Sequence, residues 1–120
     1  MAADSAFINY LMEQLQWVGP VKGRKMFGGY GVFLEGLMFA LVIDNTLYLK
    51  IDNDSKRDFD ALGLPPFTYL RGEKTIALSY YQAPEEALDD MDMLIVWANR
   101  AYQAALRSAA EKSKKPARRV

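Results

Sequence analysis

The fold of this chain is decided by residues 24–51, which read RKMFGGYGVFLEGLMFALVIDNTLYLKI. Three apolar runs lie within this stretch, at residues 32–34, 37–43 and 46–51. They are separated only by the two-residue breaks Glu35-Gly36 and Asp44-Asn45. Breaks this short join antiparallel strands, because a parallel pair needs a crossover of about a dozen residues. The stretch therefore predicts a meander of three antiparallel strands.

A helix is predicted on each side of this meander. Before it, apolar side chains recur at a spacing of three and four over residues 7–18. Asp4 or Ser5 can cap this helix, because a short side-chain oxygen accepts hydrogen bonds from the first turn. After the meander, residues 52–54 read Asp-Asn-Asp and cap a short helix that ends at Gly63.

The second half of the chain predicts two more strands and a long final helix. The strands are rich in aromatic and β-branched residues and lie at residues 67–70 and 74–81. Pro84 then opens a helical turn. Asp89 or Asp90 caps the last helix, whose apolar stripe reaches Ala105.

Taken in order, the predicted elements are a helix, three strands, a helix, two strands and a helix. The simplest layering of these elements is an α+β fold with one antiparallel sheet and helices packed on one face. We expect a folded domain over residues 1–107. Residues 108–120 are rich in alanine, serine, lysine and arginine and are predicted to form a basic, disordered tail.

Composition limits the chemistry that the chain can perform. The 120 residues include neither cysteine nor histidine. This excludes disulfides, thiolate metal ligands, a cysteine nucleophile and the commonest general base. Lysine plus arginine and aspartate plus glutamate each number 15, so the overall charge favours no polyanionic partner. We predict no catalytic residues, no metal and no cofactor.

We expect no signal peptide at the N-terminus of this sequence. Its first residues contain Asp4 and lack the apolar run of a signal peptide. No stretch approaches the roughly 20 apolar residues that span a bilayer. We therefore expect a cytoplasmic protein with no membrane partner.

The glycines at positions 28, 29 and 31 invite comparison with phosphate-binding loops. A dinucleotide loop has the spacing G-x-G-x-x-G and opens a helix whose N-terminus meets the phosphate. Gly29 and Gly31 supply the first pair, but Leu34 stands at the third position and the next segment is a predicted strand. A hairpin or bulge that needs positive φ or a close backbone approach explains the glycines better.

The same stretch can be compared with the aromatic strand that RNA-recognition sheets stack on bases. Gly28 stands where that motif has a basic residue, and Val32-Phe33 inverts its aromatic–aliphatic order. The motif is therefore not matched, although Arg24 and Lys25 could still contact phosphates. Such cations also commonly protect a sheet edge from aggregation. Direct nucleic-acid binding through Arg24, Lys25 and the basic tail stays open as an alternative function.

The acidic clusters are explained by helix starts better than by metal binding. Asp52, Asp54 and Asp58 are spaced like the start of a calcium loop, which also needs glycine at its sixth position and an acid at its twelfth. Those positions hold Arg57 and Gly63. The acids between residues 85 and 92 stand at a predicted helix start, where they favour the positive end of the helix dipole.

The candidate interaction surface consists of Arg24, Lys25, Tyr30 and Tyr81. The first three border the glycines of the first hairpin. Tyr80 and Tyr81 are neighbours in a predicted strand and point to opposite faces, so we expect one buried and one half-exposed ring. An exposed edge strand or these aromatic rings would form the docking surface.

Five blocks of the sequence resemble the N-terminal domain of the TfoX/Sxy family. They are Arg-Lys-Met-Phe-Gly-Gly-Tyr-Gly at 24–31, Met-Phe-Ala-Leu at 38–41, Leu-Tyr-Leu-Lys at 47–50, Pro-Phe-Thr-Tyr at 66–69 and Tyr-Tyr-Gln-Ala-Pro-Glu at 80–85. The resemblance extends from about Phe7 to Arg107.

This resemblance implies an α+β domain with an antiparallel sheet, similar to that of secretion chaperones. It also implies regulation, since named members of the family are regulators of natural competence that act with an activator of the cyclic-AMP receptor type. Those regulators carry a second, C-terminal domain, whereas this sequence ends in a short basic tail and so resembles a stand-alone N-terminal domain. The family supplies no catalytic residues to carry over.

The leading hypothesis is a non-enzymatic regulatory or protein-interaction module. Its partner would be a transcription regulator or a second copy of this chain, as a homodimer. The alternatives are the nucleic-acid-binding function above and a small-ligand pocket between the sheet and the helices.

Overall fold

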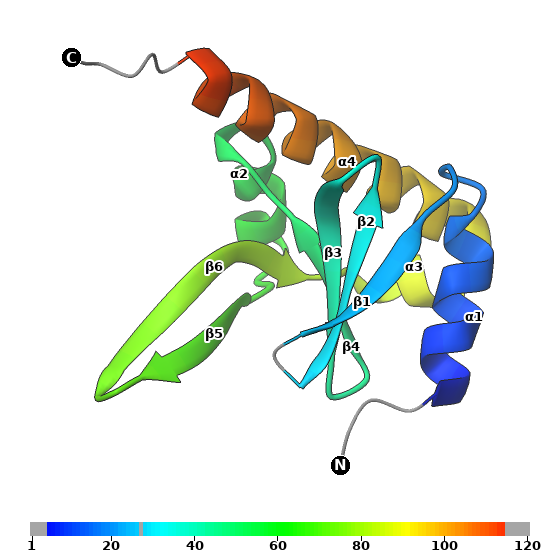
Figure 1. The fold of residues 1–120 in the computed structure, drawn as a ribbon, viewed down its shortest axis with the longest axis horizontal. Helices are drawn as coiled ribbons and strands as arrows, with labels where there is room; N and C mark the ends of the chain where they lie inside the picture. The colour runs from blue at the N-terminus through cyan, green and yellow to red at the C-terminus, as the bar shows by residue number, and fades with distance from the viewer. Residues whose placement is uncertain (1–4, 27, 115–120) are drawn as a thin grey trace.

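The computed structural model describes residues 5–26 and 28–114, which form one sheet covered by helices (Figure 1). The sheet has six strands in the order β1-β2-β3-β4-β6-β5, so β1 and β5 are its two edges. All neighbouring strands are antiparallel. The predicted α+β class with a single antiparallel sheet is therefore confirmed.

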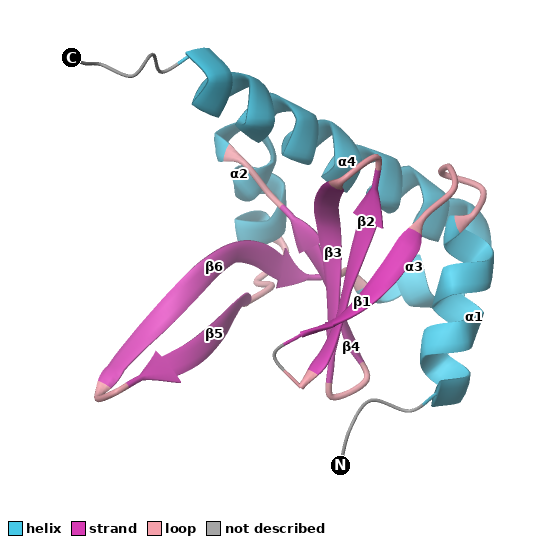
Figure 2. Cartoon of the chain, viewed as in Figure 1, coloured by secondary structure: helices cyan, strands magenta, loops and turns pink. Residues whose placement is uncertain are grey.

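The chain alternates between the sheet and its helical cover. The helices of the described residues are α1 (Ser5–Leu15), α2 (Asn53–Ala61), α3 (Glu85–Asp89) and α4 (Met91–Lys114). The strands are β1 (Lys22–Met26), β2 (Gly29–Leu34), β3 (Leu37–Ile43), β4 (Thr46–Lys50), β5 (Pro66–Arg71) and β6 (Lys74–Gln82). In Figure 2 the β5–β6 hairpin extends away from the helices.

The two turns of the meander have the geometry that tight hairpins need. Glu35 and Gly36 have φ of 51° and 81°, and Asp44 and Asn45 have φ of 52° and 58°. Positive φ at both central residues matches the right-handed twist of the flanking strands. The meander predicted between residues 32 and 51 is confirmed as β2, β3 and β4.

The sheet contains one strand more than the sequence predicts. β1 pairs with β2 from Lys22↔Phe33 to Met26↔Gly29. Its sequence, Lys-Gly-Arg-Lys-Met, contains no apolar alternation, and only its last residue is partly buried. Pairing with β2 therefore makes this segment a strand, rather than its own propensity.

Helix α4 also extends further than expected. The sequence predicts a disordered tail from residue 108, but the helix continues through Lys114. Alanine, glutamate and lysine are good helix formers, and Ser108 and Ala109 are still half-buried. Residues 108–114 are thus helical rather than disordered, and the rest of the predicted tail, residues 115–120, lies outside the described chain.

The main core lies between the helices and one face of the sheet. Its side chains exposed by 1% or less include Leu11 and Leu15 of α1, Val32, Phe39, Ala40, Val42, Leu47 and Leu49 of the meander, and Leu94 and Ala98 of α4. The helices therefore pack on one face of the sheet, as predicted.

A smaller core lies on the opposite face of the sheet. It contains the buried residues Leu41, Phe67 and Tyr80, surrounded by half-buried Met26, Met38, Ile43, Tyr48, Tyr69 and Leu78. It anchors the base of the β5–β6 hairpin, of which only Tyr80–Gln82 pairs with β4. We call the rest of this hairpin, residues 66–79, the arm.

Candidate interaction surfaces

The first candidate surface is the edge formed by β1, which we call the basic edge. Its exposed cations are Lys22, Arg24 and Lys25. No other strand of the described chain pairs with the outer side of β1. Because side chains alternate along a strand, Arg24 and Lys25 point to opposite faces of the sheet. Two of the predicted partner-binding residues thus lie on this edge, one on each face.

Arg24 is held against the sheet by an aromatic ring. Its guanidinium carbon lies 5.3 Å from the centroid of the Phe33 ring on the neighbouring strand. A cation over an aromatic face contributes about 0.5–1 kcal/mol at an exposed site. Lys25 is paired with Tyr30 and lies with it on the side of the main core. Arg24 is therefore oriented in advance of any contact with a partner.

The two tyrosines predicted for this surface contribute much less to it. Tyr30 is half-buried against the main core. Tyr81 is only 9% exposed and packs edge-on against Phe59 of α2, with ring centroids 6.0 Å apart. Tyr80 is equally buried on the opposite face, so the expected half-exposed ring does not exist. The reason is that the arm builds the smaller core over Tyr80. The structure thus places Arg24 and Lys25 on one strand, with only Lys25 on the same face as Tyr30, and it places Tyr81 elsewhere.

The glycines beside the basic edge serve the close approach of strands, as predicted. A Cβ atom on Gly29 would lie 2.1 Å from the carbonyl oxygen of Val42. A Cβ atom on Gly31 would lie 2.7 Å and 2.8 Å from the sulfur atoms of Met38 and Met26. The segment that follows is β2 and not a helix, so these glycines form no phosphate loop of the dinucleotide type.

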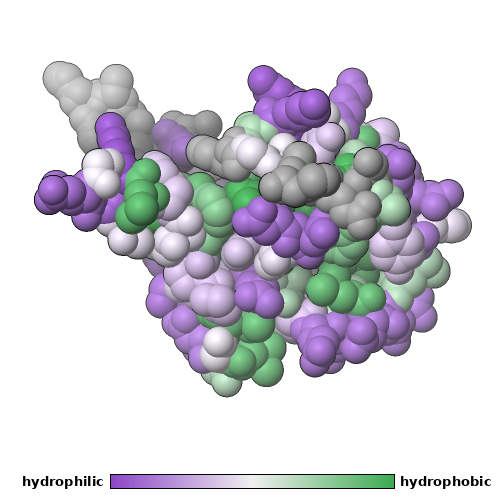
Figure 3. Space-filling view, turned by 90° about the horizontal axis from the view of Figure 1, so that it is seen from below, coloured by the Kyte–Doolittle hydropathy of each residue, from purple (hydrophilic) through white to green (hydrophobic). Residues whose placement is uncertain are grey.

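The smaller core presents a second candidate surface with aromatic character. The rings of Tyr48 and Phe67 meet edge to face, with centroids 5.4 Å apart. The Tyr80 hydroxyl donates a hydrogen bond to the carbonyl oxygen of Met38 at 2.9 Å, and burial raises the pKa of Tyr80 to about 12. Lys50 Nζ lies 5.2 Å from the centroid of the Tyr80 ring. Figure 3 shows that exposed hydrophobic residues form separate patches among hydrophilic ones.

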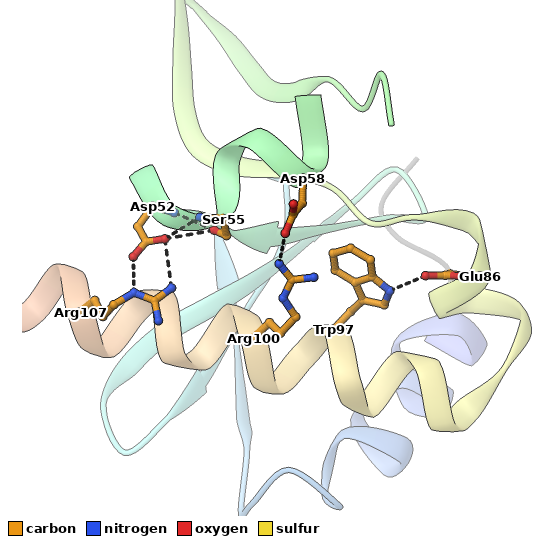
Figure 4. Close-up of polar contacts among 7 residues, drawn as sticks. All are labelled: Asp52, Ser55, Asp58, Glu86, Trp97, Arg100 and Arg107. Atoms are coloured by element: carbon orange, nitrogen blue, oxygen red, sulfur yellow. Dashed lines mark hydrogen bonds and ion pairs between the residues drawn. The ribbon is translucent and has the colours of Figure 1, made fainter. Parts of the chain in front are cut away.

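A third feature is an ionic cluster that joins α2 to α4 (Figure 4). Asp52 caps α2, because its carboxylate accepts from the Ser55 N–H while the Ser55 hydroxyl accepts from the Asp52 N–H, each at 3.1 Å. Arg107 donates to both carboxylate oxygens of Asp52, at 2.5 Å and 3.1 Å. Arg100 pairs with Asp58 through a single contact, in which its Nη2 donates to one carboxylate oxygen. The predicted capping of α2 is confirmed.

This cluster is built for structure rather than for acid–base chemistry. Hydrogen bonds from Arg107 lower the pKa of the Asp52 carboxyl from 3.8 to about 2, although burial acts in the opposite direction. The hydrogen bonds from Ser55 contribute to the same lowering of this pKa. A carboxylate whose pKa is lowered in this way is charged at neutral pH and has no proton to donate there.

Trp97 connects the ionic cluster to α3. Its indole Nε1 donates a hydrogen bond to Glu86 Oε2 at 2.8 Å, and the Arg100 guanidinium carbon lies 4.6 Å from its ring centroid. The interaction surface predicted from the sequence did not include Arg100 or Arg107. One signal could have identified them. Arg100 and Arg107 are two turns apart on the predicted last helix, so they lie on one face of it and could pair with the acids of residues 52–58.

Residues 5–26 and 28–114 contain no group of three or more aspartate, glutamate, histidine or cysteine side chains placed to hold a metal ion. Separately, no helix in the same residues has the length and apolar character needed to cross a membrane.

The sequence of this chain is similar to a known protein family and to two named proteins. Residues 13–105 match the model of the TfoX N-terminal domain. The chain is 29% identical over 82 residues to the DNA transformation protein TfoX1 of Aliivibrio fischeri, which covers 68% of this chain and 37% of that protein. It is also 29% identical over 97 residues to Protein Sxy of Escherichia coli, which covers 79% of this chain and 46% of that protein. The chain thus spans less than half the length of these relatives, and it belongs to the TfoX N-terminal domain family.

Proposed function

We propose that this chain is a cytoplasmic regulatory module that acts by binding another protein and not by catalysis. The observation that carries the proposal is the match to the TfoX N-terminal domain over residues 13–105. One relative is named a DNA transformation protein, which makes the regulation of DNA uptake the first process to examine. The relatives are more than twice as long as the matched region, so their activity as whole proteins is extended to this chain only as part of this proposal.

The partner site that we favour is the basic edge. An extended segment of another protein can add to a sheet edge through backbone hydrogen bonds, while side chains at alternate positions provide specificity. Lys22 and Arg24 point to one face of β1 and Lys25 points to the other. The matching partner is an extended segment with acidic residues, because its charges complement these three cations.

The first experiment identifies and then measures this partner. The full chain is used to capture proteins from host extract, and each captured protein is purified and titrated against the chain. We expect the affinity to fall when Arg24→Glu and Lys25→Glu are combined. The matched control is Lys74→Glu, which reverses an exposed cation on the arm. Captured proteins that bind both variants equally, or a capture that yields background alone, would contradict the proposal.

A second candidate function is direct nucleic-acid binding. It is favoured by the concentration of three exposed cations on the five residues of β1. In Figure 1 the C-terminal end of α4 lies well away from β1, so the basic edge and the end of this helix form two separate regions. A mobility shift with mixed-sequence duplex DNA, weakened by salt and by Arg24→Glu with Lys25→Glu, would favour this function over protein binding.

A further inference from the structure

The two edges of the sheet differ sharply in charge. β1 carries Lys22, Arg24 and Lys25, whereas β5 reads Pro-Phe-Thr-Tyr-Leu-Arg and has no charge before Arg71. When a strand pairs with its own copy about a twofold axis, a concentration of like charge is brought against itself, which is unfavourable. Self-pairing is therefore opposed by charge at β1 and is not opposed at β5.

The arm also exposes the kind of side chains that isolated edges usually avoid. Leu70 is 73% exposed, and Thr68, Thr75 and Ala77 on the same face of the arm are exposed as well. A two-stranded hairpin without further support is marginally stable in water, so a third strand would stabilise it. Figure 1 shows the arm projecting from the rest of the molecule, and no other strand of the described chain pairs with the outer side of β5.

The register of the hairpin determines which backbone groups β5 offers. Arg71 pairs with Lys74 across the two-residue turn Gly72-Glu73. In such a hairpin the pair that flanks the turn exchanges both of its hydrogen bonds, and every second residue then directs its N–H and C=O groups outward. Leu70 and Thr68 are these outward-facing residues, and both possess an N–H.

We propose that β5 pairs with β5 of a second copy of this chain, antiparallel and centred on Tyr69, to form a symmetric dimer. In this register Thr68 exchanges two backbone hydrogen bonds with the partner's Leu70, and the twofold axis repeats them. Arg71 lies opposite the partner's Phe67, so no like charges meet.

Other symmetric registers are poorer. Centring on Thr68 would place Leu70 opposite the partner's Pro66, which has no N–H to donate. Centring on Leu70 would place Thr68 opposite the partner's Gly72, which lies in the turn. The dimer uses the edge opposite to the proposed partner site, so either proposal can fail without the other.

A single cysteine tests the register directly. The chain has no cysteine of its own, so Tyr69→Cys introduces one thiol at the twofold axis. Residues that face each other there as a non-hydrogen-bonded pair have Cβ atoms about 4.5–5.5 Å apart, near the separation that a disulfide needs. We expect a disulfide-linked dimer on a non-reducing gel after mild oxidation. Thr75→Cys, which places an exposed thiol on β6 away from the edge, should stay a monomer on the same gel.

A charge pair provides a second test that does not alter the half-buried Tyr69. Leu70→Asp should raise the dimer dissociation constant at least about tenfold in sedimentation equilibrium, since it changes two symmetric contacts. Adding Thr68→Lys sets a lysine opposite each aspartate across the axis and should restore the dimer. Ala77→Asp, exposed on the same face but on β6, should leave dimerisation unchanged.

The outcomes distinguish pairing of β5 with a second copy of this chain from pairing with a different protein. A concentration-dependent dimer that responds to Leu70→Asp and is restored by the added lysine supports the proposal. A wild-type chain that stays monomeric at its highest soluble concentration would overturn it, and would leave β5 as an edge for a different protein. Equal cross-linking of Tyr69→Cys and Thr75→Cys would also overturn it. If circular dichroism shows that Tyr69→Cys is unfolded, the charge pair decides.

Discussion

The two edges of this sheet are built by different means and expose different chemistry. β1 is a strand only because it pairs with β2, and its exposed side chains are mainly basic. β5 belongs to the arm, whose base is held by Phe67 and Tyr80 while Leu70 is exposed near its tip. Lysine and arginine on an edge discourage unspecific strand addition, and β5 lacks them before Arg71. The charge of an edge, and not only its openness, therefore decides which partner it can accept.

The largest effect is expected where the arm is anchored. Phe67→Ala removes a ring that is 9% exposed and that contacts Tyr48 edge to face. The lost burial and the cavity left behind should lower the free energy of unfolding by about 3 kcal/mol. Urea denaturation measures this change. The matched control is Phe33→Ala beside the basic edge, which is only half-buried and should cost about 1 kcal/mol. Equal losses would show that the two edges are anchored alike.

The next largest loss of stability is expected at Gly29 of β2, the strand that holds the basic edge in the sheet. Gly29→Ala would force a Cβ atom toward the Val42 carbonyl oxygen, a backbone atom that cannot rotate away. We expect a loss of about 2 kcal/mol in the free energy of unfolding, with weakened amide protection along β1 in hydrogen exchange. Gly36→Ala has open space around its Cβ but φ of 81°, and should cost about 1 kcal/mol without affecting β1. Normal protection of β1 in Gly29→Ala would contradict this role.

A substitution at Asp52 alters neither edge of the sheet and so provides a reference for the changes at the two edges. Asp52→Ala removes the cap of α2 and should cost about 1 kcal/mol at neutral pH. The pKa of Asp52 is lowered to about 2 in the folded chain, so the unfolded chain binds the extra proton as the pH falls. The stabilisation is therefore complete above about pH 5 and is lost towards pH 2.

Denaturation of both chains across this pH range tests the sign. The difference between wild type and Asp52→Ala should shrink as the pH is lowered. Asp54→Ala, whose side chain is 76% exposed and 3.6 Å from Arg107, should show little difference at any pH. A difference that grows on acidification would refute the assignment of the Arg107 ion pair as its cause.

The smallest effect on stability should come from the cations of the basic edge. Replacing Arg24 and Lys25 together by threonine should lower the free energy of unfolding by about 0.5–1 kcal/mol, because both side chains are exposed and only the contact of Arg24 with the Phe33 ring is lost. The same change should increase self-association in light scattering, since it removes the charge that guards β1. The control is Lys56→Gln on α2, which removes an exposed cation from a helix and should leave self-association unchanged. An unchanged scattering profile would show that charge does not protect this edge.

Local signals in the sequence predicted a large share of the fold. Alternating apolar runs with two-residue breaks identified β2, β3 and β4, and the acids at 52–54 identified the start of α2. The glycines between residues 28 and 31 were correctly predicted to allow positive φ or a close approach of the backbone, and not to bind phosphate. These features depend on neighbours within a few residues, so composition and spacing are enough to reveal them.

The remaining features depend on contacts between distant segments. β1 has no strand pattern and exists through its pairing with β2, while Tyr80 is buried because the arm covers it. Arg107 reaches Asp52 across 55 positions of sequence, and the spacing of the charges along the helix does not specify this partner. The sequence by itself therefore determined the elements other than β1, their order and the family. Only the tertiary structure decided which strands became edges, and with what charge, because edge position depends on long-range pairing and not on any single segment.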